Sequence, residues 1–204
     1  MSRDYFGNYP IVAGLGFSRD VLLLDDCEGT MTWEVSGTGG DDVHEYLAAA
    51  AWQGTYGMHL KTRTTGTTVD DYVLAQKLFD WPSTNLLVAR LRVTPVVVAN
   101  TKGITITLAA DDGSDGYTGA IKLAPDGSKV YYSNSAGSWV ELTDLAMTYY
   151  ALHWLTVELA LDLKAHTYRH LRFNGWETDL STLSLKAAGA SASRGARRAA
   201  SATA

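Results

Sequence analysis

The segment from residue 153 to residue 175 has the clearest alternation of apolar and polar positions in the chain. Every second residue from Leu155 to Leu163 is leucine or valine, and most residues between them are polar. A period of two indicates a half-buried β-strand, because successive side chains of a strand point to opposite faces of a sheet. The polar residues 164–166 then predict a turn into a second strand that ends at Asn174-Gly175. We therefore predict a long antiparallel hairpin here.

Short strands separated by turn signals are predicted along most of the remaining chain. These strands are Val21–Leu24, Met31–Val35, Tyr56–Thr62, Tyr72–Phe79, Asn85–Val93, Gly103–Ala109, Tyr117–Leu123, Lys129–Tyr132 and Ser138–Leu142. Val43–Ala51 fits a helix by its alanine run and a strand by its Gly-flanked setting, and both alternatives stay open. In the turn Pro125-Asp126-Gly127, proline presets φ and glycine is expected to accept a positive φ.

The two ends of the chain differ in composition from this strand-rich middle. Residues 1–19 contain aromatic residues and glycine without sustained periodicity, and we predict an N-terminal arm there. Residues 187–204 hold no aromatic or large aliphatic side chain, so they cannot bury enough apolar surface to offset the entropy of ordering. We expect a low-complexity tail that needs a partner to become ordered. The central domain is predicted at residues 20–186.

Bulk composition suits one globular β-domain, since 46% of the 204 residues are hydrophobic and 19% are charged. The net charge of −5 argues against a nucleic-acid binder, and the basic cluster Arg194–Arg198 is expected to be a solvated part of the tail. The single cysteine, Cys27, excludes an internal disulfide and is predicted to be a buried small side chain. With no secretory pattern and no apolar stretch of membrane-spanning length, we expect synthesis and folding in a reducing cytosol.

The order of these signals resembles the concanavalin A-like, laminin-G-like jelly roll over residues 20–185. The resemblance rests on the acidic turn 25–29, on Gly54–Leu60, on His153–Val157, which is similar to the family's "W-H-x-V/L-x-V/L" strand, and on the strand that ends at Asn174-Gly175. It implies an all-β fold in which two antiparallel sheets stack as a jelly-roll sandwich.

One departure from the family pattern concerns the end of the domain. The family usually closes with a further strand after the hairpin, whereas only Thr182–Lys186 remains here before the tail. Either the N-terminal arm or another subunit completes the sheet, or an edge stays open. Open edges recruit partners through their unpaired backbone groups.

Glycoside hydrolysis is the first chemistry that this resemblance suggests. Related hydrolases present their carboxylates in an E-x-D-x-x-E motif, and that motif is absent. Glu158 and Asp162 share one strand face, but four residues of strand separate them by roughly 13 Å, whereas retaining hydrolysis needs about 5–5.5 Å. We interpret both as solvent-facing residues and predict no enzyme. His166 and His170 would form a metal pair on a helix but stand far apart on a strand.

Calcium is a further candidate ligand, because two acidic loops could supply oxygen ligands. Asp111 and Asp115 lie in one loop, and Asp26 and Glu28 lie in the acidic segment that holds a structural calcium in some similar jelly rolls. The alternative is that these carboxylates bond their own turns. Apart from this calcium, no cofactor is predicted.

Tryptophan side chains could stack against sugar rings, as aromatic platforms do in glycan-binding folds. Of the six tryptophans, Trp154 and Trp176 are the best surface candidates, because Trp154 lies opposite the aliphatic face and Trp176 follows a glycine turn. The alternative is packing or contact between subunits.

Two functional classes follow. The first is a structural virion protein, a decoration or cement protein of a tailed bacteriophage capsid. It would be made in the host cytoplasm and would bind capsid protein and copies of itself through its arms and sheet edge. The second is a carbohydrate-binding module of a phage tail or cell surface. No membrane partner is expected for either.

Overall fold

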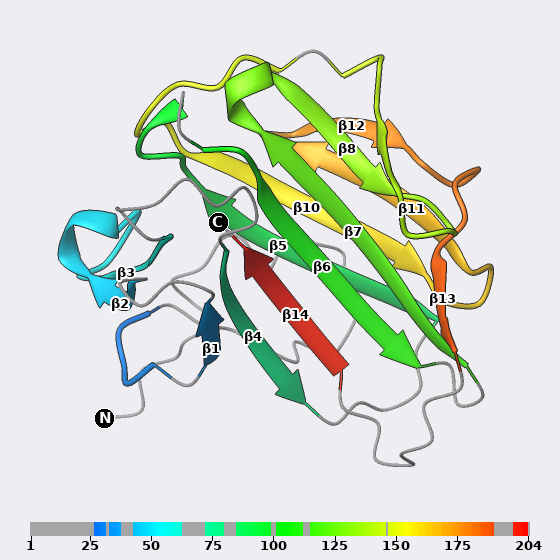
Figure 1. Ribbon diagram of the computed structural model, residues 1–204, viewed down its shortest axis with the longest axis horizontal. Coiled ribbons are helices and arrows are strands. Elements are labelled where there is room, and N and C mark those ends of the chain that lie inside the picture. Colours follow the sequence, from blue (N-terminus) through cyan, green and yellow to red (C-terminus); the bar gives the residue numbers. More distant parts are fainter. Residues whose placement is uncertain are drawn as a thin grey trace.

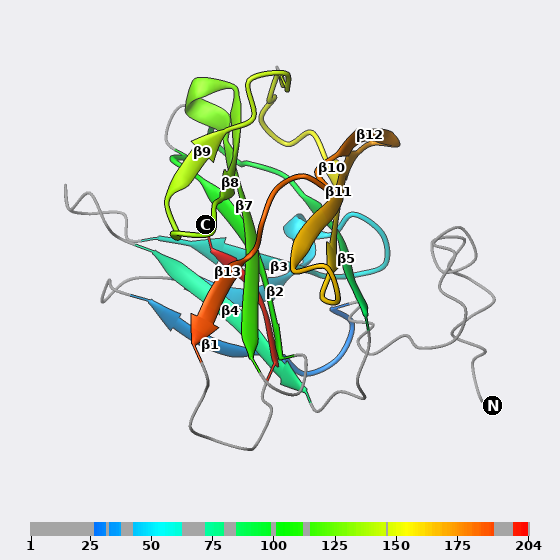
Figure 2. The same ribbon diagram turned by 90° about the vertical axis from the view of Figure 1, so that its right-hand side faces the viewer.

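The computed structural model is an antiparallel β-sandwich, which confirms the predicted all-β fold class (Figure 1). Two sheets lie face to face, and Figure 2 shows them edge-on with the larger sheet on the left and the smaller on the right. The structure describes residues 27–31, 33–37, 43–62, 72–79, 85–98, 101–111, 115–145, 147–189 and 198–203. The predicted arm 1–19 and strand Val21–Leu24 lie outside these residues. Among the described residues, no helix is long and apolar enough to cross a membrane.

The larger sheet has the strand order β1-β4-β14-β6-β7-β8-β9, and β13 pairs with the first residues of β7. Its strands are β1 (Glu34–Gly37), β4 (Val73–Phe79), β6 (Ile104–Asp111), β7 (Gly116–Ala124), β8 (Lys129–Ser133), β9 (Trp139–Glu141), β13 (Lys186–Gly189) and β14 (Arg198–Thr203). Most of these strands begin and end within two residues of their predicted bounds. Strand identity could be predicted because turn residues separate the short apolar runs.

The smaller sheet has the order β12-β11-β10-β5 and contains the predicted hairpin. Its strands are β5 (Leu86–Val93), β10 (Leu155–Asp162), β11 (Thr167–Phe173) and β12 (Trp176–Asp179). β10 pairs with β5 from end to end and with β11 across one bulge after Ala160. The hairpin prediction is therefore confirmed, and β10 lies inside its sheet with a hydrogen-bonded neighbour on each side.

A separate two-stranded sheet resolves the ambiguity at Val43–Ala51. Residues Val43–Leu47 form β2, which pairs with β3 (Gly57–Lys61), and only Ala48–Ala50 adopt one 3₁₀ turn. The backbone at Gly57 lies so close to Ala50 that a Cβ there would stand 1.9 Å from the Ala50 carbonyl oxygen. Both alternatives therefore hold in part, because strand pairing takes residues 43–47 while the alanines 48–50 form a single helical turn.

The core lies between the two main sheets and follows from the alternation of β10. Val157, Leu159 and Leu161 are fully buried against the isoleucines and leucines of β6 and β7. Gly119 of β7 permits this close packing, since a Cβ there would stand 2.6 Å from the Leu161 side chain. Burial of each such aliphatic side chain contributes about 1.5–3 kcal/mol.

Two turns show how local sequence shapes the connections. Asn174 and Gly175 both have positive φ, 47° and 90°, as a two-residue hairpin turn of type I′ requires. At Pro125-Asp126-Gly127 the turn is confirmed, but the left-handed residue is the following Ser128, with φ of 53°. The expectation that Gly127 takes the positive φ is wrong, because these three residues form a 3₁₀ turn that ends one residue later.

The closing strand that the sequence lacks comes from the low-complexity tail. β14 inserts between β4 and β6 and pairs with both, and β13 includes the first residues of the same tail. Composition alone predicts no strand after residue 186. The backbone N–H and C=O groups of β4 and β6 nevertheless need hydrogen-bond partners. A strand of small residues can provide these partners, because the pairing uses backbone groups and not side chains.

The Tyr168 hydroxyl joins the two sheets directly. Tyr168 belongs to β11 and is fully buried, and its Oη donates to the Ser133 carbonyl at 2.7 Å and accepts the Ala120 amide at 2.9 Å. Ser133 ends β8 and Ala120 lies in β7, so one side chain of the smaller sheet is bound to two strands of the larger. Burial raises the pKa of Tyr168 to about 12, so the group stays a donor at neutral pH.

Replacing Tyr168 with phenylalanine should lower the free energy of unfolding by about 1–3 kcal/mol, because the Ala120 amide is left buried without its acceptor. Tyr149→Phe is the matched control. The Tyr149 hydroxyl donates to the Lys129 carbonyl at 3.0 Å and accepts no backbone amide among the described residues. Urea unfolding followed by tryptophan fluorescence measures both variants, and equal losses would contradict a special role for Tyr168.

Ending the chain after Gly189 should remove β14 and leave the edges of β4 and β6 unpaired. We expect reduced stability and self-association, because exposed strand edges pair with other chains. Size-exclusion chromatography at several concentrations measures this. A truncated chain that stays as stable and as monodisperse as the full chain would show that β14 does not complete the sheet in solution.

Candidate functional site

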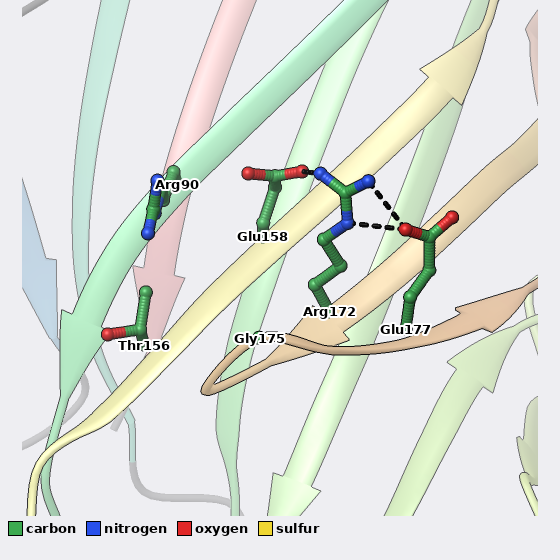
Figure 3. A pocket seen from close by; sticks show the side chains of 6 residues that line it. All are labelled: Arg90, Thr156, Glu158, Arg172, Gly175 and Glu177. Carbon is green, nitrogen blue, oxygen red and sulfur yellow. Dashed lines mark hydrogen bonds and ion pairs between the residues drawn. The ribbon is translucent and has the colours of Figure 1, made fainter. Parts of the chain in front are cut away.

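The outer face of the smaller sheet carries a row of charges of alternating sign. Register places Glu158 of β10 between Arg90 of β5 and Arg172 of β11, and it places Glu177 of β12 beside Arg172. We call these four residues the charge row. Figure 3 shows these side chains next to one another across the sheet. Glu158 lies on the outer face because the odd-numbered residues of β10 face the core.

Glu158 is the buried member of the charge row, with only 5% of its surface exposed. Its Oε1 accepts a hydrogen bond from Arg172 Nη1 at 2.9 Å and lies 2.9 Å from His170 Nε2. The prediction that Glu158 faces solvent is therefore wrong. A carboxylate on an outer face can be buried when long side chains such as Arg172 lie over it and pair with it.

Arg172 holds the two carboxylates of the row together. Its Nε donates to Glu177 Oε2 at 2.6 Å, and its Nη2 contacts the same oxygen. The hydrogen bond to Glu177, together with the charges of Glu158 and Glu177, raises the pKa of Arg172. The guanidinium is thus doubly compensated and its orientation is fixed by both neighbours.

A hollow of about 270 Å³ lies over this row. It is lined by Arg90, Thr156, Glu158, Arg172, Gly175 and Glu177. Its volume is just below the roughly 300–1,000 Å³ of pockets for drug-sized ligands, so it suits a smaller unit. We call it the outer-face hollow.

Several polar groups of the outer-face hollow have bonding capacity to spare. Glu158 Oε2 and Glu177 Oε1 accept no hydrogen bond from any described residue. Arg90 is exposed, and within the described residues it makes no hydrogen bond or ion pair. Figure 3 accordingly shows dashed lines around Arg172 and none at Arg90. The hollow therefore offers acceptors and donors side by side.

An aromatic cluster adjoins the hollow. Arg92, two residues after Arg90 on β5, is the register partner of Thr156, and its guanidinium lies 4.7 Å from the centre of the Trp52 ring. Trp52 meets Trp154 edge to face, with ring centres 5.8 Å apart. Trp52 remains 51% exposed. The indole of Trp52 is therefore a partly open platform next to the polar hollow.

The two tryptophans selected from the sequence have different settings. Trp154 lies on the outer face as predicted, but Trp52 covers part of it, so it is half-buried. Trp176 is 55% exposed, yet it pairs with Phe173 in register, and Phe173 points into the core. Trp176 therefore lies on the other side of its sheet from the hollow. The glycan role of both stays a prediction.

The candidate calcium residues are not brought together in the described structure. Glu28 Oε1 accepts the amides of Thr55 at 2.6 Å and Tyr56 at 2.9 Å, and these bonds lower the pKa of Glu28. Asp26 and the side chain of Asp111 lie outside the described residues, and Asp115 is exposed. Among the residues described, no three His, Cys, Asp or Glu side chains could share a metal ion. The calcium prediction stays untested.

The remaining candidates take structural positions. His166 stacks on Tyr117 with ring centres 3.9 Å apart, whereas His170 contacts Glu158, so the two histidines do not face one ligand. Asp162 Oδ1 accepts the Ala165 amide and holds the hairpin turn. Cys27 is partly exposed at a φ of 61°, so its predicted burial is wrong, because it lies in a tight turn rather than a strand.

Sequence reasoning missed Arg90, Arg92, Arg172, Glu177 and Trp52. Each is an ordinary residue of a strand or loop, and their proximity depends on strand order and register. The pairing Arg172–Glu177 across an Asn-Gly turn was the one signal available, since register follows from a two-residue turn.

No family model and no curated protein matches the chain. A sialidase among the solved structures is similar to it, with 14% identity and a TM-score of 0.44 over 78% of this chain. The chain spans about 13% of the length of that sialidase. This likeness assigns neither a family nor an activity, and membership of the concanavalin A-like family stays a prediction.

Glu158→Gln should lower the free energy of unfolding by about 2–4 kcal/mol, because it removes the buried partner of Arg172 and His170. Glu177→Gln is the matched control and should cost about 1 kcal/mol or less, since Glu177 is exposed. Chemical denaturation of both variants provides the measurement. If Glu177→Gln costs as much as Glu158→Gln, the burial of Glu158 has no energetic importance.

Proposed function

We propose that this protein is a non-catalytic carbohydrate-binding β-sandwich, and that sugar binds over the outer-face hollow. The observation that carries the proposal is the combination of spare carboxylate oxygens, an unpaired arginine and an exposed indole on one sheet face. Sugars present hydroxyl groups at their edges and C–H groups on their faces. A site of paired polar groups beside an aromatic platform matches both.

The hydrogen-bonding inventory supports a polyol ligand. Glu158 Oε2 and Glu177 Oε1 can each accept a hydroxyl, while Arg90 and the Thr156 hydroxyl can donate. Because Arg172 and His170 both contact Glu158 Oε1, the Glu158 carboxylate is oriented before ligand arrives. A preorganised site loses less entropy on binding.

The same contacts favour binding over hydrolysis. A glycosidase needs one carboxylic acid that carries a proton for the leaving group. Glu158 and Glu177 both accept hydrogen bonds from Arg172, so both are engaged in one ion-pair network rather than held apart as an acid and a base. We keep the expectation that the protein is not an enzyme.

The virion role predicted from the sequence stays a separate prediction. It relied on the arm 1–19, on the tail 187–204 and on an open sheet edge. The arm lies outside the described residues, and β13 and β14 pair within this chain. No observation on the described residues favours capsid attachment over sugar binding, although a module on a virion could do both.

Affinity gel electrophoresis against a panel of neutral and acidic polysaccharides tests the proposal. At least one polysaccharide should retard the protein, and Trp52→Ala should weaken that binding about three- to tenfold by removing the platform. Trp139→Ala is the matched control, because Trp139 is 41% exposed on β9 of the other sheet. No retardation by any polysaccharide, or equal loss in both variants, would contradict the proposed site.

A further inference from the structure

Two arginines on the outer face of the smaller sheet have no ion-pair partner among the described residues. Three guanidinium groups, those of Arg90, Arg92 and Arg172, share this face with the carboxylates of Glu158, Asp162, Glu177 and Asp179. Asp162 accepts the Ala165 amide. Glu158 and Glu177 pair with Arg172, and Glu158 also pairs with His170. Asp179, the register partner of His170, accepts the Ser181 amide. No described acid therefore pairs with Arg90 or Arg92.

Arg92 is the less satisfied of the two free arginines. Its Nε is buried and has no hydrogen-bond partner within the described structure, and the group stacks on Trp52. Desolvation and the charge of Arg90 together lower the pKa of Arg92. Two like charges on alternate residues of one strand, about 7 Å apart along the backbone, repel each other unless an anion lies near them. An anionic ligand would relieve this repulsion and could give the buried Arg92 Nε a partner.

We propose that the sugar bound at this face is an acidic one, and that Arg90 and Arg92 receive its carboxylate. This inference rests on the proposed function and specifies its ligand class. The planar fork of a guanidinium matches a carboxylate with two parallel hydrogen bonds. The pyranose ring then lies against the exposed part of the Trp52 indole that Arg92 leaves uncovered, and its hydroxyls reach Thr156 and the spare oxygens of Glu158 and Glu177.

Arg90 can be replaced without removing any hydrogen bond or ion pair that the described structure contains. Arg90 makes no bond within the described structure, so Arg90→Gln removes a charge without breaking a fold contact. Lys102→Gln is the matched control, since Lys102 is an 80% exposed cation beside the larger sheet that pairs only with Asp126 among the described residues. Urea unfolding should show that Arg90→Gln is at least as stable as the parent chain, because the substitution removes the repulsion between Arg90 and Arg92.

The experiment compares polygalacturonate with its fully methyl-esterified form, which has the same sugar rings and no carboxylate charge. Isothermal titration should show binding to polygalacturonate that Arg90→Gln weakens about tenfold, the effect of one lost charge-assisted hydrogen bond. Lys102→Gln should bind as the parent chain does. Added salt should weaken binding of the acid and leave any binding of the ester unchanged.

The outcomes separate this inference from the proposed function. Equal binding of acid and ester, or unchanged affinity of Arg90→Gln, overturns the acidic ligand and leaves sugar binding in place. Binding to a neutral polysaccharide alone, with loss in Trp52→Ala, does the same. If no polysaccharide binds at all, the proposed function itself fails.

Discussion

The alternation of β10 is the constraint on which the rest of the structure depends. β10 is hydrogen-bonded on both sides, so its backbone cannot shift without breaking two ladders. A slip of one residue would move Val157, Leu159 and Leu161 out of the core and Glu158 into it. The pairing register of β10 and the burial of its apolar side chains therefore require each other. The positions of the outer-face side chains of β10 follow from this register.

The two sheets are joined by more than apolar contact. Tyr168 reaches from β11 to the backbone of β7 and β8, so its hydroxyl forms buried hydrogen bonds between the two sheets. A hydrogen bond in an apolar interior is directional, whereas hydrophobic packing tolerates small shifts. The smaller sheet is thus anchored to the larger one by a directional bond as well as by packing, and the charge row lies on its outer face.

The outer face of the smaller sheet holds one arginine whose charge is paired with carboxylates and two arginines whose charges are not. Arg172 lies between two carboxylates and pairs with both, while Arg90 and Arg92 form no ion pair with an acid in the described structure, although Glu158 is the register partner of Arg90. Stability alone would favour pairing or neutralising such arginines, because like charges in proximity cost free energy. The contrast between the paired and the unpaired arginines on one sheet face is what points to a ligand rather than to a structural network.

The sequence by itself determined the fold class, most strands and the main hairpin, because alternation and turn residues act locally. It also determined that every second residue from Leu155 to Leu163 faces the core. Only the tertiary structure decided that Arg90, Glu158, Arg172 and Glu177 stand in one row, since these residues come from four strands whose order no local pattern encodes. The same holds for β14, whose small residues carry no apolar signal and which is placed by the unpaired backbone of its neighbours.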